Sequence, residues 1–434
     1  MTTSGVLQIA MRGKNRTQVL AVAALLAIVG AACSGNASKV AGSASTASSA
    51  STEPIKIGVV GPMTGLASFV GKNMVEGIQL AVDDLNQAKL LGGRPVEFIQ
   101  RDDEYDPAKT VTAVRELIEK EHVVALFGPA NATTYLSVKR IIDDAQIPAW
   151  VIAAGSQLGQ DPYAFRAFIP DSIEINALAK YLPNHFSKIA IVGGNDPESE
   201  VFNTAMKVAL TANGKPPVAI ATFAVDDTDY SPIALKIKQS GADAVILGTQ
   251  LGLFGARYVQ AQKNIGGNAK VFGLAGLINY TYPDLARAAA DGTTFVSFRS
   301  WGHLPRSQWP PSVLNFYNRY VKRYLPDGEY SETGAYKAYS TNFLTYDMVR
   351  IWGAAVAKAN SADPKKVAAV LNAGFTYPAS QSVIGVPWQY SATNHDGIQP
   401  GDLYFYRWEL QPNNKFKLAF LGTVSDVVSG KVAI

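Results

Sequence analysis

The chain of 434 residues contains a single cysteine, Cys33, and only four histidines. One thiol cannot form a disulfide within the chain, so the fold has to depend on its hydrophobic core. No two histidines have metal-ligand spacing such as i,i+4. The chain also lacks the G-x-S-x-G motif of serine hydrolases and the G-x-G-x-x-G motif of dinucleotide-binding proteins. We therefore expect no metal site, no cofactor and no enzymatic activity.

A large excess of charge of one sign is also lacking. The chain has 39 Lys and Arg against 35 Asp and Glu, a formal net charge of +4 at neutral pH. Three of these basic residues, Arg12, Lys14 and Arg16, lie near the N-terminus, and without them the balance is 36 to 35. Because nucleic-acid-binding proteins usually carry a basic surface, we expect no nucleic-acid partner.

Long apolar runs are absent apart from one that follows these basic residues. Residues 20–32 (LAVAALLAIVGAA) are too short to span a bilayer comfortably, which takes about 20 residues. Basic residues, an apolar core and a small-residue end predict a signal peptide over residues 1–32. Cys33 follows directly, as in the lipobox of bacterial lipoproteins, so we expect lipidation of Cys33. The alternative is an unpaired thiol in an ordinary signal peptide.

Residues 33–54 are mostly Ser, Ala, Thr and Gly, which predicts a flexible tether after the lipid anchor. The expected location is the cell envelope, on the outer side of the cytoplasmic membrane or in the periplasm. The remaining residues, about 380, are more than one core usually holds, so we expect two lobes.

From Ile55 onward, short apolar runs alternate with helical patterns, and the alternation begins again after Asp171. Strands separated by helices pair in parallel, so each half is expected to be an α/β lobe with a parallel central sheet. The predicted strands are 55–60, 95–100, 123–127 and 148–152, then 189–192, 218–223, 244–247 and 270–273. Toward the C-terminus the pattern predicts helices near 309–325 and 334–359 and strands around 403–408 and 415–421.

Polar loops of small residues follow these strands, at the edge of an open α/β sheet where ligands bind. Helix N-termini at this edge offer free backbone N–H groups. The loops are 62–71, 128–134, 153–157, 193–199, 249–252 and 274–280. The acidic run 102–104 suggests either a cation site or a solvated strand end, and the Asp106-Pro107 helix cap that follows favours the second.

Several segments together resemble the type I periplasmic binding proteins of ABC importers, and more closely their leucine/isoleucine/valine-binding group. The segments are IKIGVVGPMTGLASFVG (55–71), EGIQLAVDDLN (76–86), VVALFGP (123–129), NFLTYDMVRIWGAAVA (342–357) and NHDG (394–397). The resemblance implies two Rossmann-like lobes joined by three crossover strands, a small solute bound between them, and ABC permease subunits as partners. A ligand-sensing receptor of the same fold, coupled to a signalling partner, is the alternative.

The resemblance also implies domain limits and site residues. The first lobe is expected at 55–170 plus 295–400 and the second at 171–294 plus 401–422, with a tail at 423–434 and hinges near Asp171, Gly292 and Gly401. The implied ligand-binding residues are Phe69, Thr133, Thr134, Ala153, Ala154 and Ser156 in the first lobe and Ser199, Gln250, Ala275 and Tyr280 in the second.

Two departures from the family bear on the solute. Amino-acid-binding members place an acidic residue near Ala275 for the ligand's ammonium group, and the loop 274–277 has none. Ala132 stands where many members hold a serine for the ligand's carboxylate. Because a buried ammonium without a partner is unfavourable, these departures favour a less zwitterionic solute. Candidates are an amide, an aromatic or other carboxylate, or an amino-acid-like compound.

Overall fold

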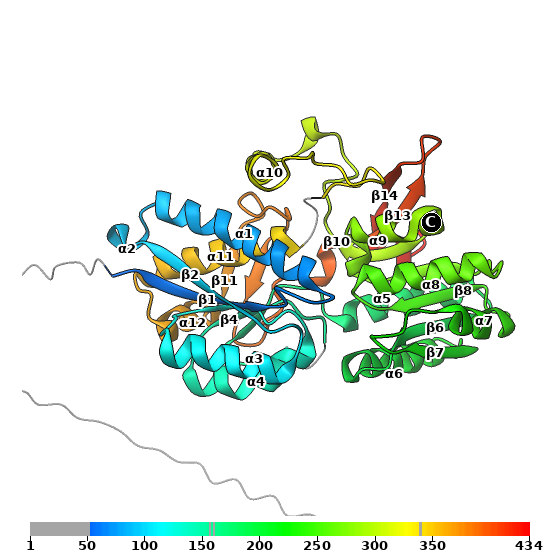
Figure 1. The fold of residues 1–434 in the computed structure, drawn as a ribbon, viewed down its shortest axis with the longest axis horizontal. Helices are drawn as coiled ribbons and strands as arrows, with labels where there is room; N and C mark the ends of the chain where they lie inside the picture. Colours follow the sequence, from blue (N-terminus) through cyan, green and yellow to red (C-terminus); the bar gives the residue numbers. More distant parts are fainter. Residues whose placement is uncertain (1–52, 156–157, 159–160, 338–340) are drawn as a thin grey trace, which may run out of the picture. The chain divides into compact units, whose positions relative to one another are not determined.

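The computed structural model describes residues 53–155, 158, 161–337 and 341–434 (Figure 1). Cys33, the predicted signal peptide and most of the predicted tether lie outside the described residues. Within this part of the chain, no helix combines the length and the apolar character needed to cross a membrane.

The described residues from 55 to 166 form a sheet of five parallel strands in the order β2-β1-β3-β4-β5. The strands are β1 (Ile55–Gly61), β2 (Val96–Asp102), β3 (Leu126–Phe127), β4 (Ala149–Val151) and β5 (Ala164–Arg166). The helices between them are α1 (Ser68–Gln87), α2 (Leu90–Gly93), α3 (Pro107–Arg115), a π-helical turn (Glu116–Lys120) and α4 (Ala132–Ala145). This sheet and the helices packed on it are called the first lobe.

Burial on both faces explains the apolar strands of the first lobe. Ile57 and Val59 in β1 alternate with Val60 and Gly58, and all of these positions are buried. Such strands need helices on both faces of the sheet. Figure 1 shows α1 and α11 (Thr341–Ala359) on one side and α3 and α4 on the other.

A second sheet has seven described strands in the order β14-β13-β10-β9-β8-β6-β7. Strands β6 to β10 run parallel, and β13 and β14 are antiparallel additions at one edge. The strands are β6 (Ile189–Gly194), β7 (Ala219–Phe223), β8 (Ala244–Gly248), β9 (Lys270–Gly273), β10 (Thr294–Phe298), β13 (Leu403–Leu410) and β14 (Phe416–Thr423). The helices are α5 (Asp171–His185), α6 (Pro197–Ala212), α7 (Ser231–Gln239), α8 (Gly252–Asn264), α9 (Thr281–Ala286) and α13 (Val424–Val428). These elements are called the second lobe.

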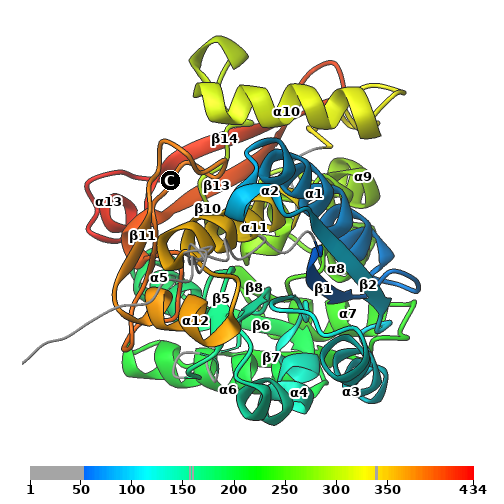
Figure 2. The ribbon, with the colours of Figure 1, turned by 90° about the vertical axis from the view of Figure 1, so that its left-hand side faces the viewer.

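The chain passes between the two sheets three times: after β5, after β10, and again before β13. Between the last two passages it returns to the first lobe, where α11 packs along α1 (Figure 2). This returning segment contains α10 (Pro311–Tyr324), α11, α12 (Pro364–Asn372) and the antiparallel pair β11 (Phe375–Tyr377) and β12 (Trp388–Tyr390). The predicted fold class, two α/β lobes with parallel central sheets, is confirmed.

Several boundaries differ from the prediction. Residues 295–298, which the resemblance assigned to the first lobe, belong to β10 and pair with β9 and β13 in the second sheet. Helix α11 begins at Thr341 and not near 334, because residues 331–335 form a turn with Gly334 at φ +85°. The predicted C-terminal tail includes α13 and is attached to the second lobe, where the Tyr181 hydroxyl donates to the Ile434 carbonyl at 3.0 Å.

Candidate functional site

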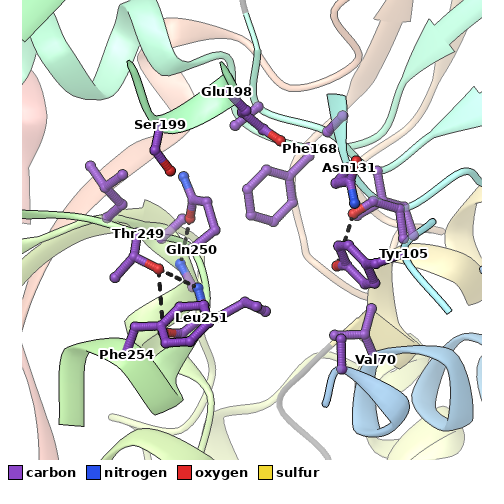
Figure 3. Close-up of a pocket in the computed structure, with 18 of the residues that line it drawn as sticks. Val70, Tyr105, Asn131, Phe168, Glu198, Ser199, Thr249, Gln250, Leu251 and Phe254 are labelled. Carbon is purple, nitrogen blue, oxygen red and sulfur yellow. Dashed lines mark hydrogen bonds between the residues drawn. The ribbon is translucent and has the colours of Figure 1, made fainter. Parts of the chain in front are cut away.

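A cavity of about 460 Å³ lies between the two lobes (Figure 3). Its walls are the loops that follow β1 to β5 in the first lobe and β6 to β10 in the second. These are the carboxyl ends of the parallel strands, where open α/β sheets bind ligands. The volume suits one small organic molecule.

Aromatic rings form much of the cavity wall. The lining includes Phe69, Tyr105 and Phe168 from the first lobe and the crossover that follows it, and Phe202, Phe223, Phe254 and Phe298 from the second. The rings of Phe168 and Phe298 meet edge to face with centroids 6.4 Å apart, and those of Phe223 and Phe254 lie 5.0 Å apart. Such walls favour an apolar or aromatic body in the bound molecule.

Tyr105 is presented to the cavity by a strained loop. Glu104 and Tyr105 have φ of 49° and 60°, a left-handed conformation that non-glycine residues seldom adopt. The Asp102 carboxylate accepts the Glu104 N–H, and the Asp103 carboxylate accepts the Tyr105 N–H, each at 3.0 Å. The Tyr105 hydroxyl then donates to the Ala130 carbonyl at 3.1 Å. The carboxylates of Asp102 and Asp103 thus hold the backbone of the loop in its left-handed conformation.

The helix cap predicted after this run is also present. The Asp106 carboxylate accepts the backbone N–H groups of Ala108 and Lys109 at 2.8 and 2.9 Å, with Pro107 at the first helical position. Among the described residues, no group of three or more His, Cys, Asp and Glu side chains is arranged to hold a metal ion. The capped helix that the sequence favoured is therefore present, but the strand end is not solvated throughout, because Asp103 is only 1% exposed.

Glu198 connects the two lobes at the N-terminus of α4. Its carboxylate accepts the Ala132 backbone N–H at 3.2 Å, and it faces the first lobe in Figure 3. The side chain is positioned by the N-cap of α6, where the Asp196 carboxylate accepts the N–H groups of Glu198 and Ser199 at 3.1 Å. Asn131 caps α4 by accepting the Thr134 N–H at 2.8 Å.

On the second lobe, Gln250 and Ala275 are fixed by a buried carboxylate. Glu174 accepts the Ala275 N–H at 2.7 Å and the Gln250 side-chain amide N–H at 2.8 Å. The Gln250 amide oxygen in turn accepts the Gly276 N–H at 2.9 Å. Gly276 is required here, because a Cβ at this position would lie 1.7 Å from the Gln250 carbonyl oxygen.

Burial perturbs the acidic groups of the site. Burial raises the pKa of Asp171 to about 6, although the Arg166 guanidinium opposes the shift. Burial, reinforced by the charge of Asp171, raises the pKa of Glu198 to about 7. Burial and Asp171 also raise the pKa of Glu174 well above its usual range. In each case the low-polarity surroundings disfavour the charged form.

An ammonium group in the cavity would not lack a partner, contrary to what the loop 274–277 led us to expect. That loop has no acidic residue, but Asp171 at the start of α5 and Glu198 in the first turn of α6 both line the cavity. The carboxylates come from other helices and not from the loop beside Ala275. An ammonium group in the cavity would have acidic partners.

The structure gathers most of the predicted site residues. The predicted residues that line the cavity are Phe69, Thr133, Ala153, Ala154, Ser199, Gln250 and Ala275. Thr134 does not line it, because its hydroxyl bonds to Asn131 within the first turn of α4. The half-buried Tyr280 is also not among the lining residues, and Ser156 lies outside the described residues.

Other lining residues were missed by the sequence analysis. Tyr105, Asn131, Phe168, Asp171 and Glu198 all follow strands of the two sheets and border the cavity. Asn131 and Glu198 fall within the loops 128–134 and 193–199 that the strand order had already placed at the binding edge. Tyr105 follows the acidic run that was weighed only as a cation site or a strand end.

Comparisons with known proteins give a consistent result. A family model described as "Periplasmic binding protein" matches residues 54–415. The Leu/Ile/Val-binding protein homolog 6 of Brucella abortus (strain 2308) is 29% identical over 204 residues, covering 46% of this chain and 52% of that protein. The chain thus matches about half the length of that relative. The Leu/Ile/Val-binding protein BraC3 of Rhizobium johnstonii is 25% identical over 364 residues, covering 82% of this chain and 92% of that protein.

Solved structures share the fold at lower identity. The branched-chain amino acid transporter substrate-binding protein LivJ of Streptococcus pneumoniae, in complex with isoleucine, gives a TM-score of 0.69 at 19% identity and covers 85% of this chain and 100% of that chain. An ABC transporter solute-binding protein of R. palustris, in complex with 4-hydroxybenzoate, gives a TM-score of 0.71 at 22% identity. The match covers 85% of this chain and 96% of that chain. The same two-lobed fold therefore occurs with chemically different ligands.

Proposed function

The chain belongs to the periplasmic binding protein family, as its sequence predicted, and from this premise we propose that it is the solute-binding component of an ABC importer. It captures a small organic solute between its lobes and delivers it to permease subunits. The candidate solutes are amides, aromatic or other carboxylates, and amino-acid-like compounds.

One observation carries this proposal: both lobes contribute to a single apolar cavity at the carboxyl ends of their sheets. Its aromatic walls can bury a solute, while Asn131, Glu198 and Gln250 provide polar contacts. Three chain passages join the lobes, which permits a hinge motion that opens and closes the cavity. A family of solute-binding proteins performs no chemistry on its ligand, so the solute is expected to leave unaltered.

Attachment to the envelope forms part of the same proposal. The apolar run 20–32 followed by Cys33 supports cleavage before Cys33 and acylation of its thiol. The protein would then stand outside the cytoplasmic membrane, within reach of a permease. Mass spectrometry of the mature N-terminal residue tests this: an acylated Cys33 supports the anchor, and an unmodified N-terminus elsewhere contradicts it.

A thermal-shift screen of small solutes tests the proposed function. Amino acids, amides, amines, aromatic acids and small sugars would each be added to the purified full-length chain. A ligand that binds only the folded state stabilises it by about 2.7 kcal/mol at a hundredfold excess over Kd, which is easily seen as a raised melting temperature. We expect a large shift with one chemical class. The absence of a shift with every class would contradict the proposal.

A further inference from the structure

The charged side chains around the cavity are all acidic. The described residues that line it include the carboxylates Glu104, Asp171, Asp196 and Glu198, and among them is no Lys, Arg or His. The short stretches 156–157, 159–160 and 338–340, whose structure is not described, contain no Lys, Arg or His in their sequence either. A solute carboxylate would find no cation in this wall.

The nearest buried cation is already engaged. The Arg166 guanidinium donates to Asp396 at 2.7 Å and to the Ala153 carbonyl at 2.7 Å, and its side chain is only 1% exposed. It does not line the cavity. The charge of this one arginine is therefore shared among three carboxylates, those of Asp171, Glu198 and Asp396.

Two of the four carboxylates in the wall are available to a solute. Asp196 is occupied as the cap of α6, and Glu104 pairs with Lys109 at 2.6 Å near solvent. Asp171 is 6% exposed and lines the cavity, where its carboxylate also accepts a hydrogen bond from the Gln250 side chain, and Glu198 accepts the Ala132 N–H; each carboxylate has further acceptor positions. These two are therefore the acidic groups left to bind a solute.

The Glu198 contact also occupies the position that best suits a solute carboxylate. The N-terminus of a helix attracts anions because its first N–H groups lack partners and carry partial positive charge. Here the first N–H of α4 is bonded to Glu198, a carboxylate of the protein itself. A second carboxylate at this point would lie beside Glu198 and Asp171.

We propose that the solute is a small cation without a carboxylate group: a protonated amine, or an amino-acid amide, with an apolar or aromatic body. This deepens the proposed function and rests on it. The nitrogen is held by Asp171 and Glu198, and the body packs among the aromatic rings of both lobes, whose faces also attract cations. A carboxylate in the same place would be repelled by both acidic groups and left unpaired in a buried site.

The perturbed acidic groups agree with this assignment. Burial and the proximity of Asp171 raise the pKa of Glu198 to about 7, and Asp196 raises it further while the Ala132 N–H and Arg166 oppose the shift. The charged form of Glu198 is thus disfavoured without a cation nearby. A protonated nitrogen between Asp171 and Glu198 removes much of this penalty, because opposite charges favour the ionised form.

Isothermal titration calorimetry on the full-length chain with probes of matched body tests the proposal. One set is isoamylamine, L-leucinamide, 4-methylpentanamide, L-leucine and 4-methylpentanoate. The aromatic set is 2-phenylethylamine, L-phenylalaninamide, 3-phenylpropanamide, L-phenylalanine and 3-phenylpropanoate. Within the set whose body fits, we expect the two cations to bind at least about tenfold tighter than the neutral, zwitterionic and anionic members.

A matched pair of variants tests whether Glu198 causes the preference for cations. Glu198→Gln is expected to weaken binding of the best cation at least about tenfold, because it removes the charge and keeps the shape. Glu200→Gln, in the same helix turn but exposed and outside the cavity, should leave the affinity within about twofold.

The outcomes separate the two proposals. If an amino acid or a carboxylate binds as tightly as the amine of the same body, or if Glu198→Gln binds the cation as well as the unmodified chain, the cation assignment is overturned while the proposed function stands. If no solute of any charge binds in the wider screen, both fail. The comparison among probes uses the unmodified chain. It therefore tests the preference for cations even if Glu198→Gln does not fold.

Discussion

Replacing Arg166 by methionine is expected to lower the free energy of unfolding by about 3–5 kcal/mol. Its side chain is buried and bonded to Asp396 and to the Ala153 carbonyl. Methionine fills a similar volume but leaves Asp396, whose side chain is 29% exposed, without its arginine partner, and it removes the cation that, among the described residues, acts on the buried Asp171 and Glu198. A buried carboxylate such as Asp171 that loses a nearby opposite charge destabilises a fold strongly, because the low-polarity surroundings cannot replace hydration.

Urea unfolding of the full-length chain measures this effect. Arg140→Met is the matched control, because the Arg140 side chain is 93% exposed and 3.5 Å from Asp144. Exposed pairs of this kind contribute about 0–1 kcal/mol. The double variant Arg166→Met with Asp396→Asn should lose less stability than the two single changes added together. A loss below about 1 kcal/mol in Arg166→Met would show that the pair does not hold the crossover next to the cavity.

Glu198→Gln is expected to stabilise the empty protein near pH 8, by about 2 kcal/mol, even though it weakens binding. The ordinary pKa of a glutamate is 4.5, and burial together with Asp171 raises the pKa of Glu198 to about 7. Between pH 4.5 and about pH 7, Glu198 loses its proton in the unfolded chain but keeps it in the folded chain. The free energy of unfolding therefore falls as the pH rises through this range. Above about pH 7 the folded chain carries the full free-energy cost of a charged, buried Glu198, and glutamine avoids this cost.

The stability difference between Glu198→Gln and the unmodified chain should therefore shrink as the pH falls below about 5. Asp171, Asp196 and Arg166 are the charged groups whose fields act on Glu198, and all three are kept in the variant. Thermal unfolding at several pH values without added solute provides the measurement, with Glu200→Gln as the control. A variant less stable than the unmodified chain at pH 8, or an offset that does not change with pH, would contradict the account.

The fold could be predicted from the sequence because its strands have clear apolar patterns. Two-sided burial makes β6 a continuous apolar run and β1 an apolar run apart from Lys56, and the helices between the strands carry recognisable apolar stripes and caps such as Asp106-Pro107. Strand β10 was missed because Thr294–Phe298 contains polar Thr and Ser residues that are buried within the sheet. The start of α11 was misplaced because a turn at Gly334 interrupts a segment that otherwise reads as helical.

The candidate site was harder to predict than the fold. Parallel strand order gives the edge where loops gather, and the family resemblance selected Phe69, Ser199 and Gln250 within these loops, all of which line the cavity. It does not say which side chains from other helices reach the same point. Glu174 bonds the Ala275 N–H across 101 positions of sequence, and Glu198 bonds the Ala132 N–H across 66. Contacts at such separations depend on tertiary packing, so the acidic character of the site became visible only in the structure.

A crystal structure of the protein with its tightest-binding solute tests the central claim most directly. We expect one intact molecule between the lobes, with its nitrogen within hydrogen-bond distance of Glu198 and its body against Tyr105 and Phe254. Electron density for the solute outside this cavity, or for a chemically altered product within it, would contradict the claim that the two lobes hold a solute and release it unchanged.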